Sequence, residues 1–267
     1  MLTDAIGQVF QPCHVAPRIV SLVPSLTELL IDMGLAENIV GRTGFCVHPR
    51  EFLQTLPKVG GTKDVHLEKL RSLRPTHVVV NVDENRIEQV NKIRTFVPNV
   101  IVTHPLQPED NQGLFQLFGG LFGVQHQAEK LSSQLQAALQ TARAQTQHLS
   151  QEHVVYCIWR NPWMAVGRNT YISAMLRAVG WHTLPESADA RYPMIQFNEA
   201  WFAEVHRIFL SSEPYQFRDK HLRELSGLPS LAVKIIQLID GKMVSWYGSR
   251  AAAGLRYLAG LRTSAMP

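Results

Sequence analysis

The chain has 267 residues, of which 45% are hydrophobic and 18% charged, and its formal net charge is +4. A chain of this length can bury one large core or two moderate ones, so one or two folded domains are expected. It contains no run of five or more Lys or Arg residues, which excludes a strongly basic nucleic-acid patch. The cysteines Cys13, Cys46 and Cys157 are too few and too widely spaced for a disulfide framework or a zinc finger.

The N-terminal segment Met1–Arg18 lacks the basic stretch and the apolar run of a secretory signal. No apolar run reaches the roughly 20 residues that a membrane-spanning helix needs, so membrane insertion is not expected. As the chain stands, a cytoplasmic location is expected. If Met1 is a processed or engineered start, a periplasmic location is expected instead.

Strand-like and helical segments alternate in the first part of the chain. Arg18–Ser25 predicts a strand, and the next segment predicts a helix with Ser25 as N-cap, Glu28 three residues later and Gly34 at its end. Further segments predict a helix at 67–74, a strand at 76–83, a helix at 84–96 and a strand at 99–104. Continuous Val and Ile runs between helices favour a buried parallel sheet with helices on its faces.

A long amphipathic helix is predicted from Val124 to His148. Its apolar stripe recurs at three- and four-residue spacing and consists of Leu131, Leu135, Ala138, Leu139 and Ala142. A helix of about 25 residues would be roughly 37 Å long at 1.5 Å per residue. A dimerising coiled coil is the alternative, but the stripe is short and rich in Ala, so packing along the same protein is favoured.

The α/β alternation then resumes. Strands are predicted at 153–159, 207–212 and 234–240, and helices at 169–180, 198–205 and 248–261. The expected fold class is therefore α/β, with an N-terminal lobe at 1–123, a connecting helix at 124–150 and a C-terminal lobe at 151–267. Ligands of such proteins bind in the cleft between lobes, which is lined by the loops at strand ends.

Aromatic, arginine and amide side chains gather in the loops that follow the predicted strands. The segment SWYGSR, Ser245–Arg250, combines two large aromatic residues with an arginine, which suits a flat, anionic or amide-rich ligand. A core tryptophan beside a solvated arginine is the structural alternative. The candidate ligand-binding residues are Phe45, Cys46, Asn81, Asp83, Arg160, Trp163, Arg191, Tyr192, Trp246, Tyr247 and Arg250.

Motifs of common enzyme classes are absent: the sequence has no GxSxG, HExxH, Walker A or strand-following GxGxxG. A binding protein that is not an enzyme is therefore expected. Cys46 and His48 lie two residues apart in an extended loop, which makes them the candidates for a metal pair or a Cys/His nucleophile. Nothing evident would activate the thiol, and a small buried hydrophobe is the alternative role of Cys46.

Several stretches of the chain resemble a known family. TDAIGQVF, APRIVSLVPSLTELLIDMGL, IVGRTGFCVHP and PKVGGTKDVHLEKLRSLRPTHVVV are similar to the substrate-binding proteins of vitamin B12 and iron-siderophore ABC importers, the helical-backbone group of the periplasmic binding protein fold. The resemblance covers nearly the whole chain and implies two Rossmann-like lobes joined by one long rigid helix. It also implies a monomer that holds a cobalamin-like corrinoid, haem or ferric siderophore in a shallow cleft and delivers it to an ABC permease, with no catalytic cofactor.

The resemblance assigns roles to individual residues. Phe45 matches a cleft tyrosine of the vitamin B12-binding members, Tyr192 matches a cleft tryptophan, and Ser245–Arg250 matches a segment with acidic, aromatic and arginine contacts. Thr62 and Asn81 stand where those members have tryptophans, so a different corrinoid, haem or a metal chelate is open as ligand.

Two glutamates match the permease contacts of the same family. Glu68 and Glu199 correspond to one glutamate on each lobe that meets arginines of the transporter. The alternative role of both is an acidic group in the first turn of a helix, where the helix dipole favours it. Two other functions stay open from the residues: a cytoplasmic enzyme or metallochaperone that uses Cys46 and His48, and an interaction scaffold.

Overall fold

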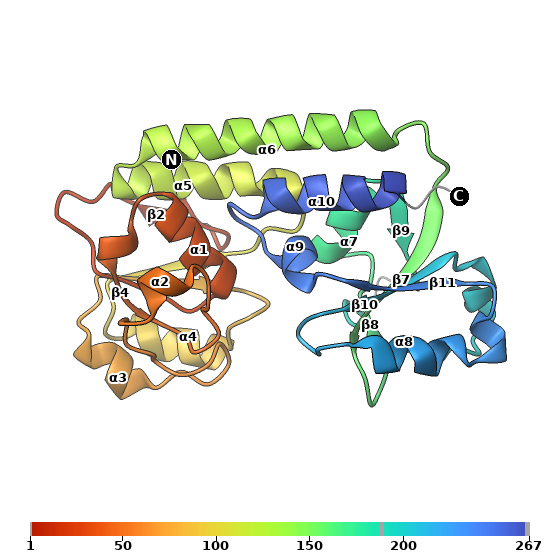
Figure 1. The fold of residues 1–267 in the computed structure, drawn as a ribbon. Coiled ribbons are helices and arrows are strands. Elements are labelled where there is room, and N and C mark those ends of the chain that lie inside the picture. The colour runs from red at the N-terminus through yellow and green to blue at the C-terminus, as the bar shows by residue number, and fades with distance from the viewer. Residues whose placement is uncertain (1, 187–189, 265–267) are drawn as a thin grey trace. The chain divides into compact units, whose positions relative to one another are not determined.

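In the computed structural model, which describes residues 2–186 and 190–264, the chain forms two compact α/β units (Figure 1). Unit 1 comprises Met1–Pro105, Glu109–Gln134 and Tyr247–Arg250, and unit 2 comprises Leu106–Pro108, Leu135–Trp246 and Ala251–Pro267. The predicted α/β class with parallel sheets is confirmed. The three-part division into 1–123, 124–150 and 151–267 stays a prediction.

Unit 1 is built on a sheet of four parallel strands in the order β4-β3-β5-β6. The strands are β3 (Ile19–Ser21), β4 (Ile39–Arg42), β5 (His77–Asn81) and β6 (Asn99–Thr103), and a hairpin of β1 (Leu2–Thr3) and β2 (Val9–Phe10) precedes them. Every residue of β5 is buried, as expected for a central parallel strand covered on both faces. Because the four strands are parallel, their carboxyl ends meet at one edge of the sheet, which we call the strand-end edge.

The helices of unit 1 are α1 (Pro24–Asp32), α2 (Arg50–Leu53), α3 (Leu67–Ser72), α4 (Ile87–Arg94) and α5 (Asn111–Phe122), with 3-10 turns η1 (Ala36–Asn38) and η2 (Pro108–Asp110). The prediction that Ser25 caps α1 is wrong. Val23 is the N-cap and Pro24 is the first helical residue, a position that the fixed φ of proline suits, so Ser25 lies inside the helix and is buried.

The predicted long helix is present as α6 (Gln125–Thr146). Its stripe residues Leu135, Ala138 and Ala142 are buried in the single chain, as expected for a helix that packs against its own protein. Helix α5 directly precedes it and was not predicted. Gly123 ends α5 with φ of +72°, the left-handed conformation that a helix C-terminus favours.

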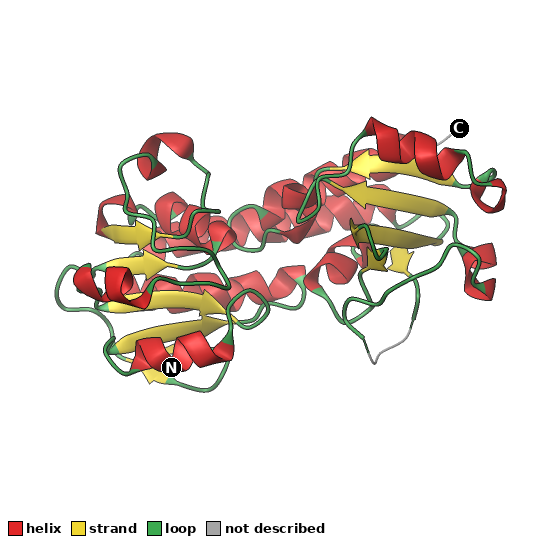
Figure 2. Cartoon of the chain, turned by 90° about the horizontal axis from the view of Figure 1, so that it is seen from below, coloured by secondary structure: helices red, strands yellow, loops and turns green. Residues whose placement is uncertain are grey.

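Unit 2 has a sheet in the order β11-β10-β7-β8, with β9 also paired to β7. Its strands are β7 (Glu152–Trp159), β8 (Met164–Ala165), β9 (Trp181–Thr183), β10 (Arg207–Ser211) and β11 (Ile235–Ile239). Strands β9, β10 and β11 run parallel to β7 or to each other, whereas β8 is antiparallel to β7. Figure 2 shows the strands of each unit as one set of neighbouring arrows.

The helices of unit 2 are α7 (Tyr171–Arg177), α8 (Asp219–Ser226), α9 (Gly241–Ser245) and α10 (Ala251–Ser264), with 3-10 turns η3 (Ala200–Glu204) and η4 (Pro229–Leu231). The helix predicted at 198–205 is therefore only a short 3-10 turn, and α8 was not predicted. Within residues 2–186 and 190–264, no helix is both long and apolar enough to cross a membrane.

A buried charge network joins the elements of unit 2. Glu152 of β7 accepts hydrogen bonds from Trp181 Nε1 at 2.9 Å, from Arg207 Nε at 3.3 Å and from Arg262 of α10. The two arginine side chains are almost fully buried. Burial alone would raise the pKa of Glu152, but the hydrogen bonds of Arg262 and Trp181 and the charges of Arg262 and Arg207 outweigh it, and the pKa is lowered. The carboxylate therefore stays ionised and supplies the negative charge that faces two buried cations.

Candidate functional site

An exposed aromatic side chain marks the strand-end edge of unit 1. Phe45 follows β4 and is 63% exposed. Its loop is tied to the next one by the hydrogen bond from Gly44 N to Gly60 O at 2.7 Å. Gly60 has φ of +110°, and a Cβ there would collide with Asp64 O, so only glycine fits this turn. Phe45 lies over Gly61, where an added Cβ would stand 3.3 Å from its ring.

Cys46 lies next to Phe45 but faces the interior. Its Sγ accepts a hydrogen bond from Thr27 Oγ1 at 3.0 Å and lies 3.2 Å from Thr43 Oγ1. Burial raises the pKa of the thiol, although the hydrogen bonds of Thr27 and Thr43 partly oppose this effect. Such a thiol stays protonated, and a protonated thiol is neither a good nucleophile nor a metal ligand.

The expected partner of Cys46, His48, is half-buried. Across the part of the chain that the structure describes, His, Cys, Asp and Glu side chains form no group of three or more that could hold a metal ion. The geometry therefore lends no support to the hypothesis of a Cys46/His48 metal or nucleophile site.

Asn81 and Asp83 follow β5 and have different surroundings. Asn81 is buried, and its Nδ2 donates to Thr103 O at 3.0 Å while its Oδ1 accepts from Asp83 N at 2.8 Å. It thereby joins the ends of β5 and β6. The carboxylate of Asp83 lies 3.6 Å from His104 Nε2 near the surface.

Trp246 from the SWYGSR segment is buried. Its Nε1 donates to Glu213 Oε1 at 2.7 Å, and Ser245 Oγ donates to the same oxygen at 3.0 Å. Burial raises the pKa of Glu213, and these two hydrogen bonds partly offset that effect. Trp246 is thus tied to the loop that follows β10.

The next residues of the segment form hydrogen bonds with other residues of unit 1. Tyr247 is buried and its hydroxyl donates to Glu84 Oε1 at 2.8 Å, while Gly248 N donates to Asn111 Oδ1 at 2.5 Å. Arg250 donates from two guanidinium nitrogens to both carboxylate oxygens of Glu28. These contacts agree with a structural role for the segment, and ligand contact by Trp246, Tyr247 and Arg250 stays a prediction.

The loop after β7 carries both predicted and unpredicted residues. Trp163 is half-buried and stacks on Phe217 with ring centroids 5.5 Å apart, and Arg160 Nη2 donates to Glu224 Oε1 at 2.7 Å. Trp159, the last residue of β7, is 42% exposed and contacts Tyr215 edge-on. Trp159 was not among the predicted site residues, although its place at the end of a predicted strand was a usable signal.

Tyr192, in the loop that follows β9, is also exposed, at 40%. The guanidinium of Arg191 lies 5.9 Å from the centre of its ring, and Arg191 Nε donates to Asn169 O at 2.9 Å. The backbone here is anchored, because Gly167 N donates to Arg191 O at 2.8 Å and Ala165 N donates to Pro193 O at 3.0 Å. Tyr192 is therefore presented on a fixed segment.

The two glutamates expected at a permease interface are both at the surface. Glu68 lies in the first turn of α3 with its side chain 86% exposed, and its closest cation is Arg71 at 4.0 Å. Glu199 accepts hydrogen bonds from Gln196 N at 2.6 Å and from Trp201 Nε1 at 2.9 Å. Glu199 thus fixes the turn before η3, whereas Glu68 is held weakly.

Comparisons with known proteins agree with this architecture. The chain is 20% identical over 199 residues to the vitamin B12-binding protein of Vibrio vulnificus, which covers 74% of the chain and 72% of that protein. Among solved structures, it is similar to the periplasmic heme-binding protein RhuT from Roseiflexus sp. RS-1, with a TM-score of 0.80, 23% identity and coverage of 94% of this chain and 99% of that one. It is also similar to the periplasmic vitamin B12 binding protein BtuF of Vibrio cholerae, with a TM-score of 0.79, 15% identity and coverage of 93% and 97%.

These structures share the fold of the present chain, and the predicted class III architecture is confirmed by them. A family model supplies the stronger assignment, because it matches residues 19–221, most of the sequence. The proteins of this family bind substrates and are not enzymes, as the missing catalytic motifs had indicated. The chain belongs to the periplasmic binding protein family.

Proposed function

We propose that this chain is the substrate-binding protein of an ABC importer and that its ligand is a large metal complex: a cobalamin-like corrinoid, haem or a ferric siderophore. Family membership supports the binding role. The observation that carries the ligand class is the exposure of three aromatic side chains: Trp159 at the end of strand β7, and Phe45 and Tyr192 in loops that follow strands. The vitamin B12- and heme-binding proteins to which the chain is similar point to the same class.

The position of these aromatic residues matters more than their exposure. Single exposed apolar side chains are common on protein surfaces. Phe45 and Tyr192, however, sit on anchored loops, so little conformational entropy is lost when a ligand covers them. A flat macrocycle gains buried apolar area and stacking from such rings. Arg191, beside Tyr192, would orient a carboxylate or amide at the rim of the ligand.

The proposal includes a permease as partner. Glu68 has the exposure that an ion pair with another protein needs. Glu199 would keep its two local hydrogen bonds and could accept further ones from the permease only with its remaining lone pairs. We place the protein in the periplasm, as a monomer that does not itself insert into the membrane. Size-exclusion chromatography with light scattering checks the monomer, and fractionation of the producing cell checks the location.

The test is a titration of the purified protein with cobalamin, cobinamide, haemin and a ferric siderophore, followed by tryptophan fluorescence. Replacing an aromatic wall residue by leucine removes stacking but keeps apolar bulk. We expect Phe45→Leu and Tyr192→Leu each to weaken binding by about tenfold, equivalent to about 1.4 kcal/mol. The matched control is Phe96→Leu, because Phe96 lies between α4 and β6, at the opposite end of the unit 1 sheet. Glu68→Ala is a second control and should leave affinity unchanged.

Two outcomes would refute the proposal in different ways. If none of the four ligands binds, the ligand class is wrong. If Phe96→Leu loses as much affinity as Phe45→Leu, the strand-end edge is not the binding face.

A further inference from the structure

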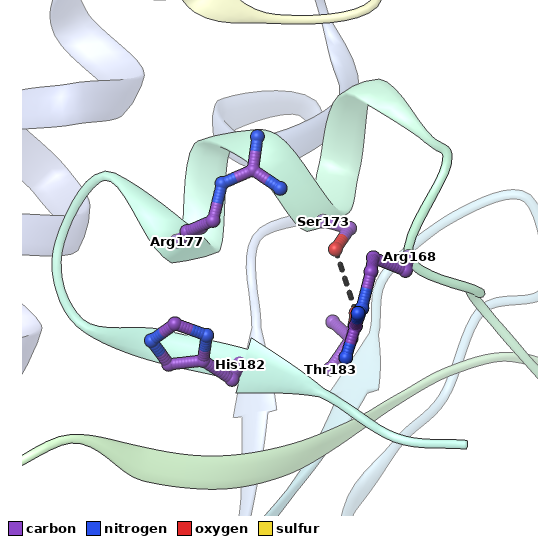
Figure 3. A pocket seen from close by; sticks show the side chains of 5 residues that line it. All are labelled: Arg168, Ser173, Arg177, His182 and Thr183. Atoms are coloured by element: carbon purple, nitrogen blue, oxygen red, sulfur yellow. Dashed lines mark hydrogen bonds between the residues drawn. The ribbon is translucent and has the colours of Figure 1, made fainter. Parts of the chain in front are cut away.

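A small polar cavity lies on unit 2, between helix α7 and strand β9 (Figure 3). Its volume is about 230 Å³, several times the roughly 30 Å³ that a water molecule occupies in the liquid. The lining residues are Arg168, Ser173, Arg177, His182 and Thr183. None of them belongs to the strand-end loops that carry Phe45, Trp159 or Tyr192, so the cavity needs its own explanation.

The lining is basic. Ser173 and Arg177 are four residues apart on α7 and therefore share a face of the helix. Arg168 comes from the loop before α7, and its guanidinium pairs with the carboxylate of Glu186. Among residues 2–186 and 190–264, Glu186 is the one acidic residue paired with these two arginines, so the described lining carries a positive charge even when His182 is neutral.

Two buried hydroxyl groups form the wall where α7 meets β9. Ser173 and Thr183 are each only 3% exposed, and their oxygens lie 2.6 Å apart in a hydrogen bond, drawn as a dashed line in Figure 3. Within the described ranges, neither hydroxyl oxygen has another hydrogen-bond partner among the side chains. The pair holds two hydroxyl protons and uses one between its members, so the other can be donated to a further acceptor.

We propose that this cavity binds a phosphate group, either as the free ion or as part of a small phosphate ester. A phosphate group presents several acceptor oxygens in different directions, which suits guanidinium donors from α7 and from its preceding loop together with a hydroxyl donor from the wall. A cation would be repelled by the two arginines. A neutral ligand would offer the two guanidinium charges no counter-ion of its own, and in the described part of the chain only Glu186 pairs with either of them.

The lowered pKa of His182 agrees with a site that binds an anion. Burial lowers the pKa of His182, and the positive charges of His153, Arg177 and Arg168 lower it further, while Glu186 acts in the opposite direction. His153 is the direct neighbour of His182 across the β7–β9 pair, and it also faces Glu204 at 3.6 Å. A bound phosphate would offset these positive charges, so it should raise the pKa of His182.

Isothermal titration calorimetry with inorganic phosphate and with methyl phosphate, at constant ionic strength, tests the proposal. We expect the double variant Arg168→Gln/Arg177→Gln to bind phosphate at least tenfold more weakly than the wild type. Ser173→Ala, a small change that should keep the fold, is expected to weaken binding several-fold. Tighter binding of methyl phosphate would identify an ester as the natural form, and tighter binding of inorganic phosphate would identify the free ion.

The matched control is Arg223→Gln, which removes the same charge from α8, an element that packs by β11. An equal loss of affinity in this control, or equal binding of succinate, would mean a general charge effect and overturn the proposal. Absence of phosphate binding in the wild type would also overturn it. NMR of the His182 ring gives a second readout, because its pKa should rise with phosphate in the wild type. Cobalamin or haem affinity should be unchanged in all these variants, so failure here is distinguishable from failure of the proposed function.

Discussion

Replacing Arg250 by methionine distinguishes a structural residue from a ligand contact. The side chains of Arg250 and Glu28 are only 18% and 14% exposed, and two hydrogen bonds join them. Asp32 lies one helical turn after Glu28 on α1. Burial raises the pKa of Asp32 and the charge of Glu28 raises it further, whereas the charge of Arg250 lowers it. The one guanidinium pairs with Glu28 and also attracts the carboxylate of Asp32 on the same helix face.

The expected cost of Arg250→Met follows from this geometry. Removing one member of a buried ion pair costs about 3–5 kcal/mol, and the remaining solvent access of this pair brings the expectation to about 2–3 kcal/mol. At about 2–4 °C per kcal/mol for a protein of this size, the melting temperature should fall by about 4–12 °C. Thermal and urea denaturation followed by circular dichroism measure the loss. Ligand affinity, from the titration described above, should change by less than about twofold.

Two further variants complete the experiment. Glu28→Gln combined with Arg250→Met should recover part of the stability, because no uncompensated buried charge remains at the pair. Arg256→Met, on the exposed side of α10, should cost less than about 0.5 kcal/mol. If Arg250→Met instead lost tenfold in ligand affinity with an unchanged melting temperature, the reasoning would be refuted and Arg250 would be a ligand contact.

Glu152→Gln should destabilise the protein by about 3 kcal/mol in urea denaturation, because Arg207 and Arg262 would stay buried without a carboxylate. Glu224→Gln, which breaks a more exposed ion pair, is the control and should cost at most about 1 kcal/mol; equal losses would contradict the special role of burial. Burial lowers the pKa of His77 from 6.5 to about 4, so the unfolded chain takes up this proton first as the pH falls. Stability is therefore complete above pH 6.5 and declines toward pH 4, by about 2 kcal/mol after allowance for solvent access. Urea denaturation at about pH 7 and about pH 4.5 measures this decline in the free energy of unfolding. The variant His77→Phe should show a smaller decline; if its decline equals that of the wild type, other groups cause it.

The alternation of strands and helices could be predicted because buried parallel strands appear in sequence as short Val- and Ile-rich runs. Helix α5 was missed for a physical reason. Its adjacent glycines look like a helix break, but they provide close packing: a Cβ on Gly119 would come within 2.7 Å of Ala128, and one on Gly120 within 2.5 Å of Leu2. Contacts between distant segments decide such positions, and local patterns do not contain them.

The same limit applies to the candidate site. Phe45 and Tyr192 were predicted to be ligand contacts and are exposed, which keeps that prediction available for testing. Trp246 and Tyr247 have the same aromatic character in the sequence, yet they are buried against Glu213 and Glu84. Glu84 is 163 positions away from Tyr247, and no local pattern could have paired them.

The return of Tyr247–Arg250 to unit 1 also affects the order in which the protein can mature on the ribosome. The main body of unit 1 ends at Gln134, and about 110 residues of unit 2 are synthesised before the last piece of unit 1 follows. At about 5–20 residues per second, the nascent unit 1 waits about 6 to 22 s for these residues. During this interval Glu28 lacks its arginine and Glu84 lacks its tyrosine. Unit 1 is therefore completed only near the end of translation, and a chain truncated before residue 247 would leave it unfinished.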